Sequence, residues 1–217
     1  MIVNLGETSS IFNQYIAEIR DVSVQQDNMR FRFNMSRIGE IAAYEISKSL
    51  AYEPSDVLTS LGTANVPVLK EYPLLIPILR AGLPIHDGVL KVFDKSSSAF
   101  VAAYRKVEKN EKFSIQIEYV SCPDITDKTI IICDPMLATG ASIVATYKAL
   151  LSHGTPAYTH IVSAIASTEG IAYIRRQLPM RKVCIWTGAI DEELTAQAYI
   201  VPGLGDAGDL AFGSKTE

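Results

Sequence analysis

The sequence contains few cysteines and histidines, and neither residue type forms a recognisable disulfide or metal-binding pattern. The three cysteines, Cys122, Cys133 and Cys184, are odd in number and far apart, and no Cys-x-x-Cys pair occurs. This argues against a disulfide framework and against a zinc ribbon. The three histidines form no His-Glu-x-x-His motif, so a helical zinc site is not indicated either. We therefore expect a protein of the reducing cytoplasm.

Long apolar runs and an excess of basic residues are also missing. The most apolar stretch, from Tyr72 to Ile85, contains Arg80 and three prolines and is too short to span a membrane. The first ten residues lack the cationic and apolar regions of a signal peptide. Twenty lysines and arginines against 24 acidic residues give a net charge of −4, which argues against nucleic-acid binding. We expect neither a membrane nor a nucleic acid as a partner.

The composition and the order of the predicted elements indicate a single α/β domain over residues 1–217. Hydrophobic residues make up 48% of the chain and charged residues 20%, which excludes disorder of the bulk. Two apolar stripes at helical spacing predict a helical arm over residues 1–52, whose first helix begins after Ser10. Apolar strands then alternate with helices, which is typical of a mostly parallel sheet flanked by helices. The predicted strands are 74–79, 98–104, 113–120, 129–133, 160–165 and 182–186, and the predicted helices are 83–93, 142–151 and 169–177.

The segment that follows strand 129–133 has the composition of a phosphate site. Ligands of such sheets bind beyond the carboxyl ends of the strands, and here Asp134 precedes a loop of small residues that contains Thr139, Gly140 and Ser142. Free backbone N–H groups and the helix dipole favour an anion where the next helix begins. The lysine of an NTPase loop is missing, so a ribose phosphate fits better, with Asp134 on the ribose hydroxyls. An ordinary capped turn has the same spacing, and the pattern alone leaves both interpretations open.

Two other segments place positive charge next to predicted strands. Arg80 follows strand 74–79 and precedes Ala81-Gly82, a combination that suits a diphosphate because a guanidinium lies beside open backbone. A polar segment inside residues 98–120 predicts a β-hairpin flap that could close over a polyanion. The cations of this flap are Arg105, Lys106, Lys109 and Lys112. A surface ion pair and a solvated loop are the alternatives, and they need no ligand.

The C-terminal segment 199–213 is rich in glycine. Gly203, Gly205 and Gly208 satisfy the pattern Gly-x-Gly-x-x-Gly, but only nine residues follow Gly208, too few for a dinucleotide-binding βαβ unit. The exposed backbone of such a loop offers N–H and C=O groups that complement the acceptor–donor–acceptor edge of uracil. A disordered tail is the alternative, which the hydrophobic residues after Gly208 disfavour.

Three segments together resemble the motifs of type I phosphoribosyltransferases and, among these, of the uracil phosphoribosyltransferase family. They are Ile78 to Leu83, Asp134 to Gly140 and Tyr199 to Asp209, and the similarity extends over the whole chain. The resemblance implies the fold of that family, with a helical arm, a β-hairpin flap and a base-binding loop at 199–213. It also implies transfer of phosphoribosyl from 5-phosphoribosyl 1-diphosphate to uracil, giving UMP and diphosphate, with Mg²⁺ as cofactor. A homodimer or higher homo-oligomer is expected, and GTP is a candidate effector.

The matched positions imply a role for particular residues. Arg80, Arg105 and Asp206 would be catalytic, and Ile200, Gly205, Asp206 and Ala207 would hold uracil. Asp206 would also meet the metal, through water or through the sugar donor. The sugar donor itself would be held by Arg80, Arg105, Asp134, Pro135, Met136, Leu137, Ala138, Thr139, Gly140, Ala141, Ser142 and Asp206.

Three positions depart from the pattern expected of the family. Ala141 stands where a second glycine is usual, and it would cost about 1–2 kcal/mol if that position needs a positive φ. Leu210 stands where an arginine is expected, and the run 194–198 lacks the expected polar residues. Two alternatives stay open beside transfer to uracil: transfer to another base, and a nucleotide-binding regulator with little or no catalysis. A purely structural dimer module would leave Arg80, Arg105 and Asp206 without a common purpose.

Overall fold

The main sheet has eight strands, most of which run parallel. The structure is a computed structural model that describes residues 1–107 and 113–214, and only the backbone of residues 105–107 and 113–114. The strand order is β1-β10-β9-β7-β4-β5-β6, with β8 also paired to β9. Only β5 and β6 pair antiparallel within this sheet, so the predicted mostly parallel sheet is confirmed. The strands are β1 (Ile2–Asn4), β4 (Leu74–Leu79), β5 (Phe100–Val107), β6 (Phe113–Ser121), β7 (Thr129–Cys133), β8 (Met136–Leu137), β9 (Tyr158–Ser167) and β10 (Val183–Asp191).

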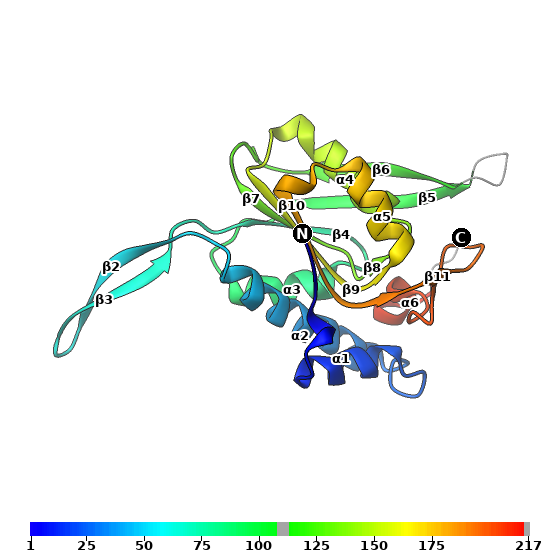
Figure 1. Ribbon diagram of the computed structural model, residues 1–217, viewed down its shortest axis with the longest axis horizontal. Helices are drawn as coiled ribbons and strands as arrows, with labels where there is room; N and C mark the ends of the chain where they lie inside the picture. The colour runs from blue at the N-terminus through cyan, green and yellow to red at the C-terminus, as the bar shows by residue number, and fades with distance from the viewer. Residues whose placement is uncertain (108–112, 215–217) are drawn as a thin grey trace.

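Helices cover both faces of this sheet (Figure 1). One face packs against α1 (Ile11–Arg20), α2 (Asn28–Ser47) and α3 (Leu83–Val92), and the other against α4 (Ala141–Leu150) and α5 (Thr168–Gln177). Successive residues of β7 alternate between the two cores, since Ile131 joins the first, and Ile130 and Ile132 join the second. Because both faces are buried, the strand has an unbroken apolar sequence.

The N-terminal region forms the two predicted helices. The Ser10 side chain accepts a hydrogen bond from the Phe12 N–H and forms a capping box with Asn13, so α1 begins where the sequence indicates. Phe12, Ile16 and Ile19 are buried and give α1 its apolar face. The sequence did not indicate β1, which precedes these helices and pairs in parallel with β10 at the edge of the sheet.

A two-stranded hairpin that the sequence analysis did not identify projects from the body of the molecule. It consists of β2 (Tyr52–Thr59) and β3 (Gly62–Leu69), paired antiparallel over their whole length and separate from the main sheet. Its tip carries two highly exposed leucines, Leu58 at 85% and Leu61 at 98%. Figure 1 shows the hairpin extending away from the helices and the sheet.

The remaining elements are short. They are β11 (Glu193–Leu194), β12 (Ile200–Val201), α6 (Ala207–Phe212) and the 3-10 turns η1 (Leu5–Glu7), η2 (Leu151–His153) and η3 (Met180–Lys182). Within residues 1–107 and 113–214, no helix has the length and apolar character needed to cross a membrane.

Candidate active site

The loop between β7 and α4 forms a small cradle at the carboxyl end of β7. Gly140 caps α4 with a φ of +75°, in the left-handed region that glycine tolerates best. A Cβ at Gly140 would also lie 2.9 Å from the Gly170 carbonyl oxygen, so glycine is required here for two reasons. Ala141 is the first residue of α4, and the non-glycine residues with positive φ in the described part of the chain are Asp127 and Ala198. The strain considered for Ala141 therefore does not arise.

The cradle encloses a cavity of about 20 Å³, which is room for about one oxygen atom. The lining residues are Asp134, Met136, Leu137, Ala138, Thr139, Gly140, Ser142 and Ile143. Of the residues predicted here, Pro135 and Ala141 do not line the cavity. Pro135 is buried, and its carbonyl accepts hydrogen bonds from the N–H groups of Ala164 and Ile165.

Polar side chains of β9 hold the cradle in shape, and the sequence analysis did not identify them. The Leu137 N–H donates to Ser163 Oγ at 3.1 Å. Ser167 Oγ donates to the Ala138 carbonyl and accepts from the Gly170 N–H at 2.8 Å. Both serines are buried, so they support the loop rather than contact a ligand. A sequence signal that could have identified them is a serine among the apolar residues of a predicted buried strand, because a buried hydroxyl needs a hydrogen-bond partner.

The turn that carries Arg80 lies directly beside the end of β7. A Cβ at Gly82 would lie 2.5 Å from the Cys133 carbonyl oxygen, so the two backbones are in close contact. The Gly82 N–H donates to the Ile78 carbonyl at 3.0 Å and is not available to a diphosphate. The interpretation of Ala81-Gly82 as open backbone with free amides was therefore wrong for Gly82, whose role is close packing next to Asp134.

The Arg80 side chain reaches from this turn to the C-terminal segment. Its Nη2 lies 3.6 Å from Asp209 Oδ1 and 3.4 Å from the Gly213 carbonyl oxygen. The side chains of Arg80 and Asp209 are each 42% exposed, so the pair is weak and a stronger anion could displace Asp209. Residues far apart in the chain, 80 and 209, therefore meet at the carboxyl ends of the strands.

The segment 199–213 is an ordered loop that ends in the short helix α6, which the sequence did not indicate. Asp206 caps this helix, since its Oδ1 accepts from the N–H groups of Gly208 at 2.8 Å and Asp209 at 3.0 Å. Gly205 has a φ of +94° and open space around it, which exposes its backbone. The side chains of Ile200 (3% exposed) and Ala207 (5% exposed) belong to the core, so uracil would meet their backbone.

The departures from the family pattern have structural roles in this loop. The run 194–198 begins at the last residue of β11 and continues into the turn to β12, where Ala198 has a φ of +62° and the Thr195 N–H donates to the Tyr199 carbonyl at 2.8 Å. Leu210 is half-buried and packs against the core below α1–α3.

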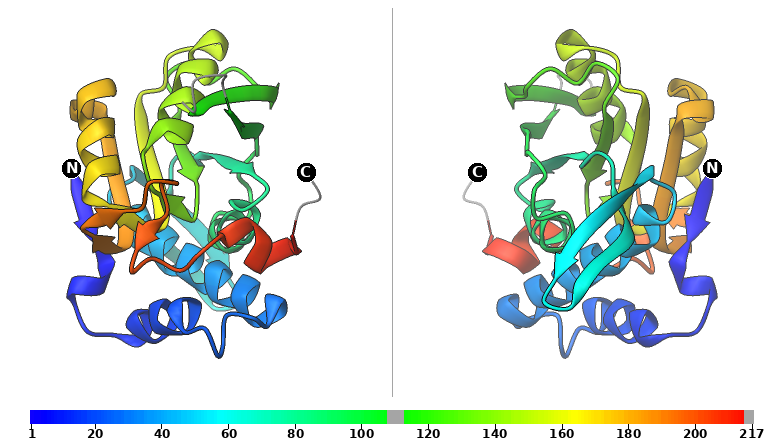
Figure 2. Two further views of the ribbon diagram at one scale, coloured as in Figure 1. Left: turned by 90° about the vertical axis from the view of Figure 1, so that its right-hand side faces the viewer. Right: turned by 90° about the vertical axis from the view of Figure 1, so that its left-hand side faces the viewer.

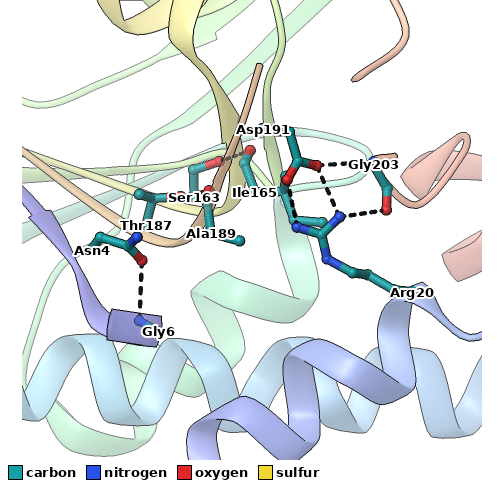
Figure 3. A network of polar contacts seen from close by, with 9 residues as sticks. All are labelled: Asn4, Gly6, Arg20, Ser163, Ile165, Thr187, Ala189, Asp191 and Gly203. Atoms are coloured by element: carbon teal, nitrogen blue, oxygen red, sulfur yellow. Dashed lines mark hydrogen bonds and ion pairs between the residues drawn. The ribbon is translucent and has the colours of Figure 1, made fainter. Parts of the chain in front are cut away.

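The Arg20 guanidinium and the Asp191 carboxylate form an ion pair under this loop, which the sequence analysis also missed (Figure 3). Both contacts of the pair are 2.8 Å, and both side chains also bond the backbone of Gly203. Burial opposes ionisation of Asp191, but hydrogen bonds from Arg20 and Gly203 outweigh it, and the pKa of this carboxyl lies below its usual value.

Part of the predicted flap lies outside the described residues. The hairpin itself is confirmed, with Arg105 on β5 opposite Ile115 on β6. The side chains of Arg105 and Lys106, and the whole of Lys109 and Lys112, fall outside the described part.

The oxygen donors of the site suit a magnesium ion that arrives with its substrate. In the part of the chain that the structure describes, no group of three or more His, Cys, Asp or Glu side chains could hold a metal. Mg²⁺ commonly binds through one or two carboxylates together with substrate phosphates rather than in a protein cage. Asp134, which lines the cradle, and Asp206, which caps α6, are the carboxylates that could contact such an ion.

The chain is similar to one family model and to several known proteins. The family model described as "Uracil phosphoribosyltransferase" matches residues 8–214. A uracil phosphoribosyltransferase from Porphyromonas gingivalis is 50% identical over 214 residues, which cover 99% of either chain. The solved structure of protein AQ2163 from Aquifex aeolicus is 31% identical with a TM-score of 0.88, and both chains are covered completely. A hypoxanthine phosphoribosyltransferase from Staphylococcus aureus, at 14% identity, a TM-score of 0.51 and coverage of 86% of this chain and 84% of its own, shares the fold alone.

Proposed function

The chain belongs to the uracil phosphoribosyltransferase family, and we propose that it transfers phosphoribosyl from 5-phosphoribosyl 1-diphosphate to uracil. The products are UMP and diphosphate, and the reaction serves pyrimidine salvage. The observation that carries this proposal is the meeting of three chain-distant segments at the carboxyl ends of the strands. The Arg80 turn touches the end of β7 through Gly82 and touches the C-terminal loop through Asp209.

The cradle and its neighbours bind the sugar donor in this proposal. The residues 134–142 hold the 5′-phosphate at the start of α4, and Asp134 accepts hydrogen bonds from the ribose hydroxyls. Arg80 and Arg105 meet the diphosphate. The C1′–O bond to diphosphate breaks, its electron pair leaves with the diphosphate, and positive charge develops on the ribose. Each good electrostatic contact to the leaving charge contributes roughly 3–4 kcal/mol, by analogy with oxyanion donors.

The loop at 199–213 binds the acceptor. The backbone of Ile200 and of Gly205 to Ala207 reads the edge of uracil, which is planar and carries two acceptors around one donor. Uracil N1 approaches C1′ from the face opposite the diphosphate, forms the new N–C bond and loses its proton. No covalent intermediate with the protein is needed, so positioning of the two substrates makes the remaining contribution.

Magnesium completes the site in this proposal. Asp206 is the residue that meets the ion, through water or through the sugar donor. When bound, Mg²⁺ neutralises charge on the diphosphate and thereby makes it a better leaving group.

A second copy of the chain is the proposed partner of the hairpin β2–β3. A two-stranded hairpin is marginally stable alone in water, and this one exposes Val57, Leu58, Leu61 and Val66. Burial of these side chains in a homodimer would stabilise both strands. Sedimentation of wild type and of a Leu58→Asp, Leu61→Asp variant tests this, because a wild-type monomer would contradict it.

The cytoplasm is the proposed compartment. Cys122, Cys133 and Cys184 are free thiols, and Cys133 and Cys184 are buried. Three unpaired cysteines suit a reducing compartment.

The deciding experiment is a transferase assay with purified protein. Labelled uracil, cytosine and orotate are each incubated with the sugar donor and Mg²⁺, with and without GTP. UMP formed from uracil, and little product from the other bases, is the expected result. Tight binding of UMP without turnover of any pyrimidine would instead indicate the regulator. Faster turnover with GTP would identify it as an effector.

A further inference from the structure

The Arg20–Asp191 pair holds the backbone of Gly203 at both of its polar groups (Figure 3). The Gly203 N–H donates to Asp191 Oδ2 at 2.9 Å, and its carbonyl accepts from Arg20 Nη1 at 3.0 Å. The pair is bidentate, with Asp191 8% and Arg20 22% exposed. Gly203 has a φ of +54°, and a Cβ there would lie 2.1 Å from the Ile200 carbonyl oxygen. The peptide groups at this position therefore cannot rotate freely.

The same N-terminal segment holds the rest of the loop. The Gln25 amide nitrogen, in the orientation that satisfies both groups, donates to the Leu204 carbonyl at 2.8 Å and to the Ile19 carbonyl at 3.0 Å. Asn28 Nδ2 donates to the Leu210 carbonyl at 2.6 Å. Arg32 Nη1 donates to the Ala211 carbonyl at 2.6 Å. Figure 2 shows the C-terminal segment running along the N-terminal helices.

We propose that Arg20 and Asp191 are positioning residues for the base, and that they fix the loop in the register in which Gly205 to Ala207 meet uracil. This inference rests on the proposed function of the loop. Gly203 lies two residues before Gly205, which is exposed and where an added Cβ would meet nothing within 4 Å. A displacement of the Gly203 backbone would therefore also displace the backbone groups of Gly205 to Ala207 that we propose bind uracil.

A buried ion pair does not by itself indicate stability. Replacement of such pairs by apolar side chains is often neutral or stabilising, whereas a precise arrangement of polar groups specifies one geometry. Here the pair joins the end of α1 to the end of β10, and each partner forms a further hydrogen bond with the backbone of Gly203. The sugar-donor cradle depends on other side chains, Ser163 and Ser167.

Loss of the pair should therefore raise the KM of uracil far more than the KM of the sugar donor. A displacement of about 1 Å at a reacting group can cost about 100-fold in rate. For Arg20→Ala and Asp191→Asn we expect the KM of uracil to rise about 10–100-fold, with a fall in kcat, and the KM of the sugar donor to change less than about threefold. Arg20→Lys keeps the charge without the bidentate geometry and should fall between wild type and Arg20→Ala.

Arg30→Ala is the matched control. Arg30 makes an equally short bidentate pair with Glu18, at 2.7 and 2.8 Å, which links α2 to α1 without touching the loop. A general loosening of the N-terminal helices would appear in this variant as well. Hydrogen exchange at the Gly203 amide gives a readout that needs no turnover, since Asp191→Asn should accelerate it and Arg30→Ala should not.

The outcomes separate this inference from the proposed function. A wild-type chain that binds UMP without turnover refutes catalysis, and the dissociation constant of UMP then takes the place of the KM of uracil in the same comparison. A chain that neither binds UMP nor turns over uracil refutes both proposals. Equal changes for both substrates, unchanged uracil affinity, or the same change in Arg30→Ala would refute positioning by the pair. If Arg20→Ala does not fold, Arg20→Lys and Asp191→Asn decide.

Discussion

Asp206 has both a structural and a proposed catalytic role, and two substitutions separate them. Its Oδ1 caps α6 by accepting hydrogen bonds from Gly208 and Asp209. Asparagine caps a helix as well as aspartate does, so Asp206→Asn should change the free energy of unfolding by less than about 0.5 kcal/mol. Asp206→Ala removes the cap, which costs about 1 kcal/mol, or a Tm lower by about 2–4 °C for a chain of this size.

The catalytic effect of the two substitutions should instead be the same. Both remove the carboxylate charge that we place next to the sugar donor and its metal. One such electrostatic contact contributes about 3–4 kcal/mol in the transition state, so kcat/KM should fall about 100- to 1,000-fold in either variant. The assay is UMP formation with saturating Mg²⁺, paired with a thermal melt of each protein. An Asp206→Asn enzyme within threefold of wild type, or one that melts as early as Asp206→Ala, would refute the reasoning.

Three further predictions follow from single contacts. Gly140→Ala should weaken binding of the sugar donor and cost about 1–2 kcal/mol of stability, because φ is +75° there, whereas Ala141→Gly should change donor affinity little. Arg80→Ala should change the free energy of unfolding by less than about 1 kcal/mol, since its pair with Asp209 is exposed, while kcat/KM falls at least tenfold; a large fall in Tm would contradict this. Burial lowers the pKa of His160 in the folded chain to about 4, whereas a histidine in the unfolded chain has a pKa of about 6.5. Below pH 6.5 the unfolded chain therefore binds a proton at His160 more readily than the folded chain does. The contribution of His160 to the free energy of unfolding should be fully present above pH 6.5 and should fall by about 3 kcal/mol as the pH drops to 4. His160→Gln should therefore flatten the dependence of Tm on pH between pH 6.5 and pH 4.

The central strands of the sheet could be predicted from the sequence because a strand that is buried on both faces consists mostly of apolar residues. β4 and β7 are covered on both faces, so each has a continuous apolar run that stands out from its surroundings. The hairpin β2–β3 gives no such signal. Strand periodicity arises when one face is buried, and nearly every residue of β2 is exposed. β1 has only three residues, which is too short for any pattern.

The candidate site was predictable where its residues are neighbours in the chain. Asp134 to Ser142 form one continuous segment between the end of β7 and the first turn of α4, so the carboxylate and the small residues stand between a strand and a helix in the sequence. Arg20 and Asp191 are separated by 171 residues, and an arginine at a helix end has no local feature that identifies a partner so distant. For Gly82, the sequence correctly indicated that the missing side chain matters. The Cys133 carbonyl, and not a ligand, occupies the space that a side chain would need.

Different side chains support the two halves of the candidate site. Hydroxyls of β9 and the backbone of α5 hold the half that we propose takes the sugar donor. The side chains of Arg20, Gln25, Asn28 and Arg32 hold the half that we propose takes the base. Arg80 links the halves, because its turn touches the end of β7 and its guanidinium reaches Asp209. Apart from Asp206, which we place next to both substrates, substitutions within one half should therefore change the KM of one substrate, whereas a substitution at Arg80 should change the KM of both.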